Sequence, residues 1–222
     1  MGTLYLVRHG QASFGADDYD QLSTLGRRQA VRLGEYFRAK GLTFEAALVG
    51  TLRRHGQTFD GICEGLQVQP PALAWPGLNE YDSEAVIAAF HTEPLARPDT
   101  PELVRHHFRL LREGLARWMR GETQPAGMPS YADFLRGVTS ALDHVRSQHQ
   151  GDVLLVSSGG PISTAVGHVL GTAAETTIEL NLRMRNCSLT EFAYTPKRHM
   201  LVSFNGLPHF EHPDCAGWMT YT

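Results

Sequence analysis

The sequence of 222 residues has few cysteines, little net charge and no long apolar run. Its three cysteines, Cys63, Cys187 and Cys215, are widely spaced and form no CxxC pair, which argues against a disulfide framework or a zinc knuckle. Twenty Lys and Arg residues against 23 Asp and Glu residues leave a net charge of −3, so no basic field indicates nucleic acid or an acidic membrane as a partner. The expected partner is a small molecule.

The N-terminal segment 1–7 lacks both a basic leader and a long apolar core, and no later segment approaches a membrane span of about 20 apolar residues. These features predict a cytoplasmic protein. Hydrophobic residues make up 42% of the chain and charged residues 19%, which is typical of a globular protein with a substantial core. We expect one domain over residues 1–222, and the composition leaves the oligomeric state open.

The order of the apolar segments predicts an α/β fold. Ser23 or Thr24 is a potential N-cap for a helix that ends near Gly41, and a second helix is expected from about residue 51 to 66. Each of these helices follows an apolar run, and the resulting βαβα order predicts a parallel sheet. The expected strands cover residues 3–7, 44–49, 153–156, 188–194 and 200–204.

Residues 83–151 show a helical pattern without a convincing strand, which we interpret as a cap-like insertion in the single domain. Thr100-Pro101 is a helix-starting pair, residues 121–129 are expected to form a loop, and residues 131–149 a returning helix. Trp118 and Tyr131 are candidates for substrate selection, but aromatic residues at helical spacing more often pack in the core. We therefore assign neither to the site.

The first polar cluster of the chain is Arg8-His9-Gly10, at the end of the first expected strand. Open α/β sheets bind ligands at such carboxyl ends. An imidazole that attacks phosphorus must be neutral, and it needs cations for the phosphoryl oxygens and an acid for the leaving oxygen. Since an isolated Arg-His pair is equally compatible with a surface position, the triplet alone establishes no site.

Two further motifs follow the triplet in order: Leu22-Ser23-x-x-Gly26-x-x-Gln29-Ala30 and Leu52-x-Arg54-x-x-Gln57-Thr58. The series resembles the histidine phosphatase superfamily, which contains the cofactor-dependent phosphoglycerate mutases. The resemblance implies a three-layer α/β/α sandwich with a mostly parallel central sheet, His9 as phosphate acceptor, and Arg8 and Arg54 as ligands of the transferred group. Arg53 is an alternative ligand, although the motif register favours Arg54.

The segment Leu78-Asn79-Glu80 is similar to the Leu-x-Glu element that carries the general acid in many members of this superfamily. Glu80 is therefore the candidate general acid and base, with Asp82 and Glu84 as competitors. A carboxyl group must hold a proton to serve a leaving alkoxide. We expect partial burial to raise the pKa of Glu80 against the opposing effect of nearby arginines.

The segment 153–160 departs from the family pattern of two apolar residues followed by Ser-His-Gly, because Ser158 stands where the second histidine is expected. Ser158 and Gly159 are the candidate phosphate-binding residues there. Removing one transition-state donor costs on the order of a hundredfold in rate. Since the candidate nucleophile, arginines and acid are retained, a slowed or retuned enzyme is favoured over a degenerate member that only binds phosphorylated ligands.

The function predicted is hydrolysis of a small phosphate monoester through a phosphohistidine on His9, with no metal and no cofactor. Mutase activity is an alternative, but residues 11–15 read Gln-Ala-Ser-Phe-Gly and lack the Trp and Asn of the mutase pattern. A serine hydrolase built on Ser158 is a second alternative, disfavoured because the first glycine of Gly-x-Ser-x-Gly is absent. The set His209, His212 and Cys215 is weak evidence for a metal site.

Overall fold

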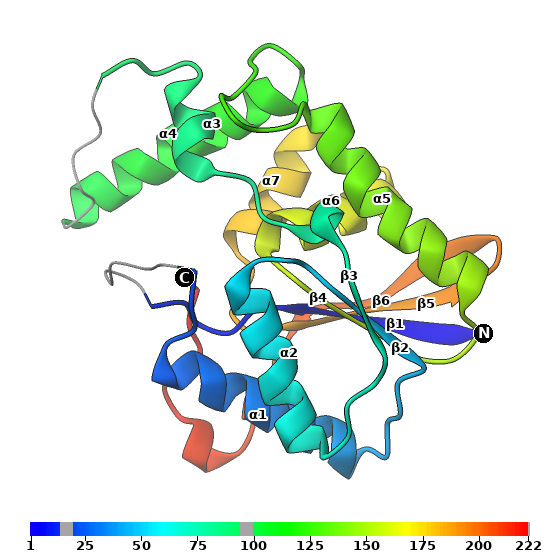
Figure 1. The fold of residues 1–222 in the computed structure, drawn as a ribbon. Coiled ribbons are helices and arrows are strands. Elements are labelled where there is room, and N and C mark those ends of the chain that lie inside the picture. The colour runs from blue at the N-terminus through cyan, green and yellow to red at the C-terminus, as the bar shows by residue number, and fades with distance from the viewer. Residues whose placement is uncertain (14–19, 94–99, 222) are drawn as a thin grey trace.

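A computed structural model describes residues 1–13, 20–93 and 100–221. The chain forms a six-stranded sheet in the order β3-β2-β4-β1-β5-β6 (Figure 1). Strands β3, β2, β4 and β1 are parallel to one another, whereas β5 is antiparallel to β1, and β6 is antiparallel to β5. The strands are β1 (Gly2–Arg8), β2 (Ala46–Val49), β3 (Ala72–Ala74), β4 (Val153–Ser157), β5 (Leu189–Thr195) and β6 (Arg198–Gly206). The α/β class is confirmed.

Helices cover both faces of this sheet. Helices α1 and α2 lie on one face, and α5 and α6 lie on the other, with α3, α4 and α7 stacked beyond them (Figure 1). Their bounds are α1 (Thr24–Ala39), α2 (Arg53–Leu66), α3 (Ser83–Ala88), α4 (Pro101–Met119), α5 (Tyr131–Gln148), α6 (Gly159–Leu170) and α7 (Ala174–Leu182). Short 3-10 helices cover Pro76–Leu78, Pro208–Phe210 and Pro213–Cys215.

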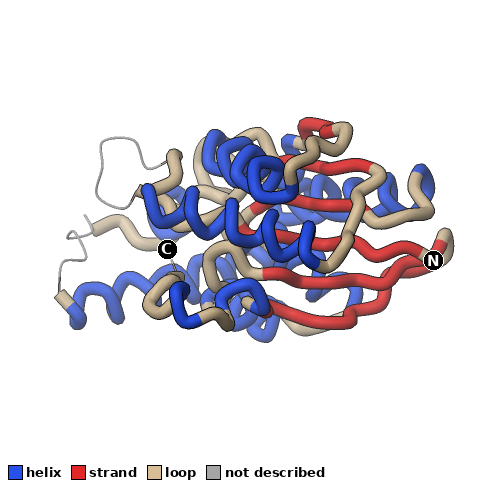
Figure 2. Tube along the Cα trace, turned by 90° about the horizontal axis from the view of Figure 1, so that it is seen from below, coloured by secondary structure: helices blue, strands red, loops and turns tan. Residues whose placement is uncertain are grey.

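The middle residues of the central strands β1, β2 and β4 are apolar because both faces of the sheet are buried there. In β1, Leu4 and Leu6 belong to the core cluster that includes residues of α4, α5 and α6, whereas Tyr5 and Val7 belong to the cluster formed with α1 and α2. This alternation follows from the period of two of a strand. Seen from below in Figure 2, the strands lie side by side between the helices. Parallel strands covered in this way appear in the sequence as continuous apolar runs.

Local capping signals locate the starts of α1 and α4 correctly. Ser23 is the N-cap of α1 and accepts a hydrogen bond from the Gly26 N–H at 3.0 Å, and Gly41 follows the helix with a φ of 68°. Thr100 caps α4 through the Leu103 N–H. The strand expected from residue 44 begins at Ala46, and the helix expected from residue 51 begins at Arg53, differences that are common at element ends.

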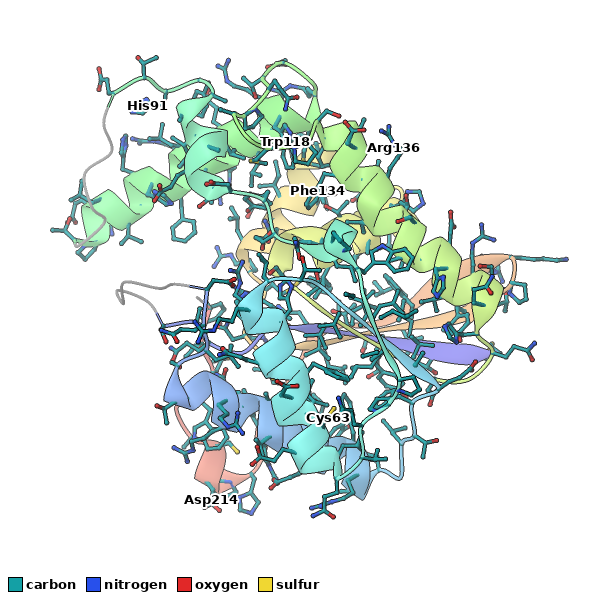
Figure 3. The ribbon with its side chains drawn as sticks, viewed as in Figure 1. Cys63, His91, Trp118, Phe134, Arg136 and Asp214 are labelled. Atoms are coloured by element: carbon teal, nitrogen blue, oxygen red, sulfur yellow. The ribbon has the colours of Figure 1, made fainter. Side chains whose placement is uncertain are left out.

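The described residues of the segment 83–151 form α3, α4 and α5 and contain no strand. Trp118 is only 1% exposed, and its ring lies 5.2 Å from the rings of Tyr131 and Phe134. Figure 3 shows Trp118 and Phe134 between the helices above the sheet. Trp118 therefore packs in the core. In the part of the chain described, no helix is long and apolar enough to cross a membrane.

Two elements, β3 and α7, are not evident in the sequence. Strand β3 has three exposed residues, lies at the sheet edge and pairs with β2. It follows Pro70-Pro71, and proline is unable to donate a ladder hydrogen bond. Helix α7 has no side-chain cap at its N-cap residue Ala173. Both elements depend on contacts with distant parts of the chain more than on local sequence.

Candidate active site

The adjacent parallel strands β1 and β4 end at the same edge of the sheet. Arg8 is paired with Ser157, and the His9 N–H donates to the Ser157 carbonyl at 2.8 Å. His9 therefore leaves β1 beside the point where Ser158 leaves β4. This edge is the one at which open α/β sheets bind their ligands.

His9 is 3% exposed, and its imidazole is hydrogen-bonded to the backbone of the next residue. Its Nδ1 lies 2.7 Å from the Gly10 carbonyl oxygen. Because a carbonyl only accepts, Nδ1 carries the proton and Nε2 keeps its lone pair. Burial lowers the pKa of His9 well below its ordinary value, and the positive charges of Arg8 and Arg54 lower it further. The ring is therefore a neutral imidazole with a nucleophilic Nε2 near neutral pH.

Side chains of the two later motifs hold the loop that carries His9. The Gly10 N–H donates to Thr58 Oγ1 at 3.1 Å, and the Gln11 N–H donates to Gln29 Oε1 at 2.8 Å. Thr58 Oγ1 in turn donates to the carbonyl of its own helix at Arg54. These bonds join α1 and α2 to the loop after β1.

Gly10 is required for close packing and not for an unusual backbone angle. Its φ is not positive, so its backbone conformation is open to other residues. A Cβ on Gly10 would lie 2.9 Å from the backbone carbon of Gly26, at the start of α1. Any larger residue would push the loop away from that helix.

Arg54 and Arg53 differ clearly in their surroundings. Arg54 is 8% exposed, whereas Arg53, the residue before it in the first turn of α2, is exposed. The Arg54 Nη1 lies 2.8 Å from Asp20 Oδ1, and Asp20 Oδ2 also accepts from the Arg53 N–H at 2.9 Å. The Asp20 carboxylate thus occupies the cationic N-terminus of α2. Any anion that binds Arg54 must compete with this carboxylate.

Arg8 lies at the end of β1 and joins the site to the C-terminal segment. Its Nη1 donates to the Tyr221 carbonyl at 3.1 Å and to the Met184 carbonyl. A Cβ on Gly159 would lie 3.8 Å from Arg8 Nε, so the start of α6 runs alongside this guanidinium. The contacts with Met184 and Tyr221 connect segments more than 170 residues apart, and no sequence pattern indicated them.

Glu80 follows the 3-10 helix Pro76–Leu78 and reaches the first turn of α6. Both of its carboxylate oxygens lie 3.1 Å from the Gly160 N–H, and a Cβ on Gly160 would collide with the carboxylate. Burial raises the pKa of Glu80, opposed first by the Gly160 N–H and then by Arg54 and Arg8. The direction agrees with that expected from the sequence, but the hydrogen bond from Gly160 was not anticipated.

The two competing carboxylates lie outside this arrangement. Asp82 is exposed and caps α3 by accepting from the N–H groups of Glu84 and Ala85. Glu84 is likewise exposed, in the first turn of the same helix. Glu80 thus differs from both of its neighbours, because it is half-buried and close enough to Arg54 and Arg8 for their charges to lower its pKa.

His55 is the site residue that the sequence analysis missed. It is fully buried in the first turn of α2, and its Nε2 lies 2.7 Å from Ser158 Oγ. Its ring centroid is 5.9 Å from that of His9. Burial lowers the pKa of His55 to about 3, with a further contribution from Arg54. The sequence offered one indication of this role: His55 directly follows the motif residue Arg54, and the histidine expected at position 158 is absent.

His209 and Cys215 lie in two separate 3-10 helices, and His212 is the N-cap of the second of them. His209 is 1% exposed and its ring centroid lies 4.1 Å from that of Phe210, whereas His212 is exposed. Within residues 1–13, 20–93 and 100–221, no group of three His, Cys, Asp or Glu side chains is arranged to hold a metal ion.

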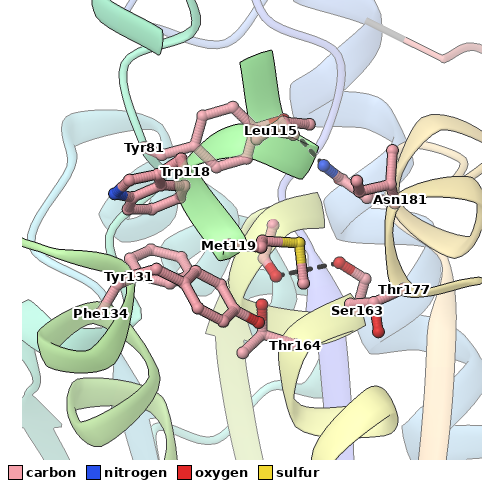
Figure 4. Close-up of a pocket in the computed structure, with 12 residues that line it drawn as sticks. Tyr81, Leu115, Trp118, Met119, Tyr131, Phe134, Ser163, Thr164, Thr177 and Asn181 are labelled. Carbon is pink, nitrogen blue, oxygen red and sulfur yellow. Dashed lines mark hydrogen bonds between the residues drawn. The ribbon is translucent and has the colours of Figure 1, made fainter. Parts of the chain in front are cut away.

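A small cavity lies next to Gly160 (Figure 4). Its volume is about 20 Å³, and the rings of Tyr81, Trp118 and Tyr131 line one side of it. Asn181 donates to the Tyr81 hydroxyl at 2.7 Å across the cavity. A space of this size holds about one water molecule. The space next to Gly160 thus lies among the side chains that pack beside Glu80.

Residues 4–206 match the family model of the histidine phosphatase superfamily (branch 1). No curated protein matches the chain. Similar solved structures include Bacillus stearothermophilus YhfR, with 18% identity, coverage of 95% of this chain and 100% of that chain, and a TM-score of 0.67. Phosphoserine phosphatase from Entamoeba histolytica in complex with 3-phosphoglyceric acid has 21% identity, coverage of 94% and 99%, and a TM-score of 0.66. Mycobacterial glucosyl-3-phosphoglycerate phosphatase has 23% identity, coverage of 93% and 100%, and a TM-score of 0.63. These likenesses show a shared fold.

Proposed function

Because the chain belongs to the histidine phosphatase superfamily, we propose that it hydrolyses a phosphate monoester through a phosphohistidine formed on His9. Membership of this superfamily supports phosphatase or phosphotransferase activity in general. The observation that carries the specific proposal is the state of His9: its Nδ1 is bound to the Gly10 carbonyl, and its pKa is lowered by burial and by Arg8 and Arg54. A neutral imidazole beside two guanidinium groups is suited to attack on phosphorus.

The first step transfers the phosphoryl group to the enzyme. His9 Nε2 attacks phosphorus, the bond between phosphorus and the leaving oxygen breaks, and the protonated Glu80 carboxyl gives its proton to that oxygen. In the second step a water molecule attacks the phosphohistidine, its proton passes to the Glu80 carboxylate, and the bond between phosphorus and nitrogen breaks. Inorganic phosphate leaves, and both residues return to their initial protonation states.

The arginines stabilise the charge that is spread over the phosphoryl oxygens during both steps. Arg54 would exchange the Asp20 carboxylate for two phosphoryl oxygens, a bidentate arrangement that suits a guanidinium. Arg8 would contribute from the other side, with Ser158 and Gly159 at the start of α6 as further phosphate ligands. These residues supply positive charge and N–H donors without requiring a metal ion.

Two other functions within the superfamily remain alternatives. A mutase would pass the phosphoryl group from His9 to a second bound hydroxyl group instead of water. The Trp and Asn of the mutase pattern are absent from residues 11–15, of which 14 and 15 lie outside the described residues, so hydrolysis is favoured. A degenerate member would bind phosphorylated ligands without turnover, which only the replacement at Ser158 supports.

A serine esterase is a second candidate function, because the 2.7 Å contact between His55 Nε2 and Ser158 Oγ is typical of a nucleophile and its base. Two features argue against it. No described carboxylate accepts a hydrogen bond from His55 Nδ1, so the ring lacks the usual third member of a triad. Ser158 has φ −118° and ψ 174°, an ordinary extended backbone and not a strained nucleophile turn.

The decisive experiment measures hydrolysis of a panel of phosphate monoesters in the presence of a chelator, with acid-quench labelling of the protein. We expect acid-labile phosphate on wild type and none on His9→Ala, with turnover lost in the variant. His212→Ala, which alters an exposed histidine, is the matched control and should behave as wild type. Turnover that survives His9→Ala would refute the proposal, and carboxylester hydrolysis lost in Ser158→Ala would establish the esterase instead.

A further inference from the structure

The reaction described above makes no use of His55, although this side chain is among the most buried polar groups of the molecule. Both His55 and Ser158 are fully buried, and their 2.7 Å contact joins the first turn of α2 to the N-cap of α6. A polar pair with no access to water forms a strong hydrogen bond. The pair lies directly beside His9, whose ring centroid is 5.9 Å from that of His55.

The surrounding backbone leaves space for this imidazole. Gly50 follows β2, and a Cβ on Gly50 would collide with the His55 ring. The Gly50 N–H donates to the Val156 carbonyl at 3.0 Å, which fixes this backbone against β4. His55 is therefore held between the ends of β2 and β4, next to the site and not on a free helix face.

We propose that His55 supplies the imidazole that position 158 lacks, acting through the Ser158 hydroxyl as a positioning residue for the phosphoryl group. This inference rests on the proposed function, since it concerns the phosphoryl group that His9 receives. The histidine that the family pattern puts after β4 would thus be replaced by two residues from different elements: a hydroxyl group on α6 and an imidazole on α2.

The direction of the hydrogen bond decides what the pair can do. If His55 Nε2–H donates to Ser158 Oγ, the hydroxyl proton is free to point at a phosphoryl oxygen. In the opposite direction Ser158 donates to Nε2 and offers no proton to the ligand. A bound phosphoryl dianion stabilises the first arrangement, because charge-assisted hydrogen bonds are stronger than neutral ones. The low pKa of His55, about 3, keeps the ring neutral, so the pair adds an oriented donor and no charge.

The contact with His55 makes Ser158 a better phosphate ligand than an isolated serine would be. An isolated serine has a freely rotating hydroxyl group, which must be ordered whenever the phosphoryl group arrives. A serine held by His55 has its oxygen fixed in place before the phosphoryl group arrives, so that only the direction of the hydrogen bond has to change. Donors held in place in this way stabilise a transition state well. The site would then lack a cationic donor relative to the family pattern while retaining a positioned neutral one.

The test is a double-mutant cycle on His55→Ala, Ser158→Ala and the double variant, with His55→Gln as the conservative variant. Turnover of a phosphate monoester and the affinity for orthovanadate, which imitates a transferring phosphoryl group, are measured for each. We expect each single variant to lose on the order of a hundredfold in kcat, and the double variant to lose no more than the worse single one. His55→Gln, whose side-chain amide offers an N–H near the position of Nε2, should recover at least part of the activity and affinity.

Thermal unfolding of every variant separates loss of function from loss of fold, and His168→Ala, an exposed histidine of α6, is the matched control. If His55→Ala does not fold, the comparison of His55→Gln with wild type and Ser158→Ala decides. Losses that multiply in the double variant, or a folded His55→Gln no better than Ser158→Ala, would overturn the inference. If His9→Ala retains turnover, the proposed function fails, but the vanadate cycle still decides whether His55 acts through Ser158.

Discussion

Replacing Glu80 by Gln tests the assignment of the general acid with little disturbance of the fold. Glutamine has nearly the same size as glutamate. Its side-chain oxygen can accept the hydrogen bond that the Gly160 N–H donates to the Glu80 carboxylate at 3.1 Å. What it removes is the transferable proton. Burial raises the pKa of Glu80, which favours the protonated form that the first step needs.

The expected loss depends on the substrate. General acid catalysis contributes about 10²- to 10⁴-fold, or roughly 3–5 kcal/mol of transition-state stabilisation. The full loss should appear with an alkyl phosphate, because its leaving alkoxide is strongly basic and needs a proton. An aryl phosphate with an acidic leaving phenol needs little protonation, so its first step should slow much less.

The assay is kcat/KM for one alkyl and one aryl phosphate on wild type, Glu80→Gln and the exposed control Glu84→Gln. kcat/KM reports the steps up to the first irreversible one and so excludes the hydrolysis of the phosphohistidine when transfer is irreversible. Equal losses for the two substrates would contradict a role in leaving-group protonation. If Glu84→Gln shows the selective loss instead, the acid has been assigned to the wrong residue.

Three further predictions follow from the site and the core. In the pH profile, kcat/KM should fall as pH drops through the lowered pKa of His9, because the imidazole must be neutral to attack. It should also fall as pH rises through the raised pKa of Glu80, because this carboxyl group must be protonated. An alkaline limb that is unchanged in Glu80→Gln would refute the assignment of Glu80. Arg54→Ala should reduce kcat/KM by about a hundredfold or more, whereas kcat/KM of Arg53→Ala should stay within about twofold of wild type. If steady-state kinetics show the reverse order, Arg53 and not Arg54 binds the phosphoryl group. Trp118→Ala should lower the free energy of unfolding by about 3–5 kcal/mol, because the indole is 1% exposed; denaturant unfolding with a loss below about 1 kcal/mol would contradict its place in the core.

Much of the fold was predictable because its signals are local. The N-caps Ser23 and Thr100 act within their own first turn, so sequence and structure agree on where α1 and α4 begin. The apolar run of β1 reflects burial on both faces and is visible without knowing its neighbours. In contrast, β3 and α7 carry little signal of their own and are defined by the sheet edge and the helices they contact.

The candidate site was predictable only in part, for a related reason. The motif order indicated His9, Arg54 and Glu80, but whether their side chains converge depends on the ends of separate strands and helices. The choice between Arg54 and Arg53 needed the burial of each residue, since helical spacing gives no preference between adjacent positions. The contact of Arg8 with Tyr221 joins opposite ends of the chain, and no local pattern encodes it.

The sequence by itself determined the class of fold, the family and the candidate nucleophile, because strand burial, helix capping and short motifs are written into neighbouring residues. Tertiary structure alone decided which groups surround that nucleophile. It brought His55 from α2 to within 2.7 Å of Ser158 at the start of α6, across 103 positions of sequence. The physical reason is that parallel strands end at a common edge, where residues far apart in the chain become neighbours.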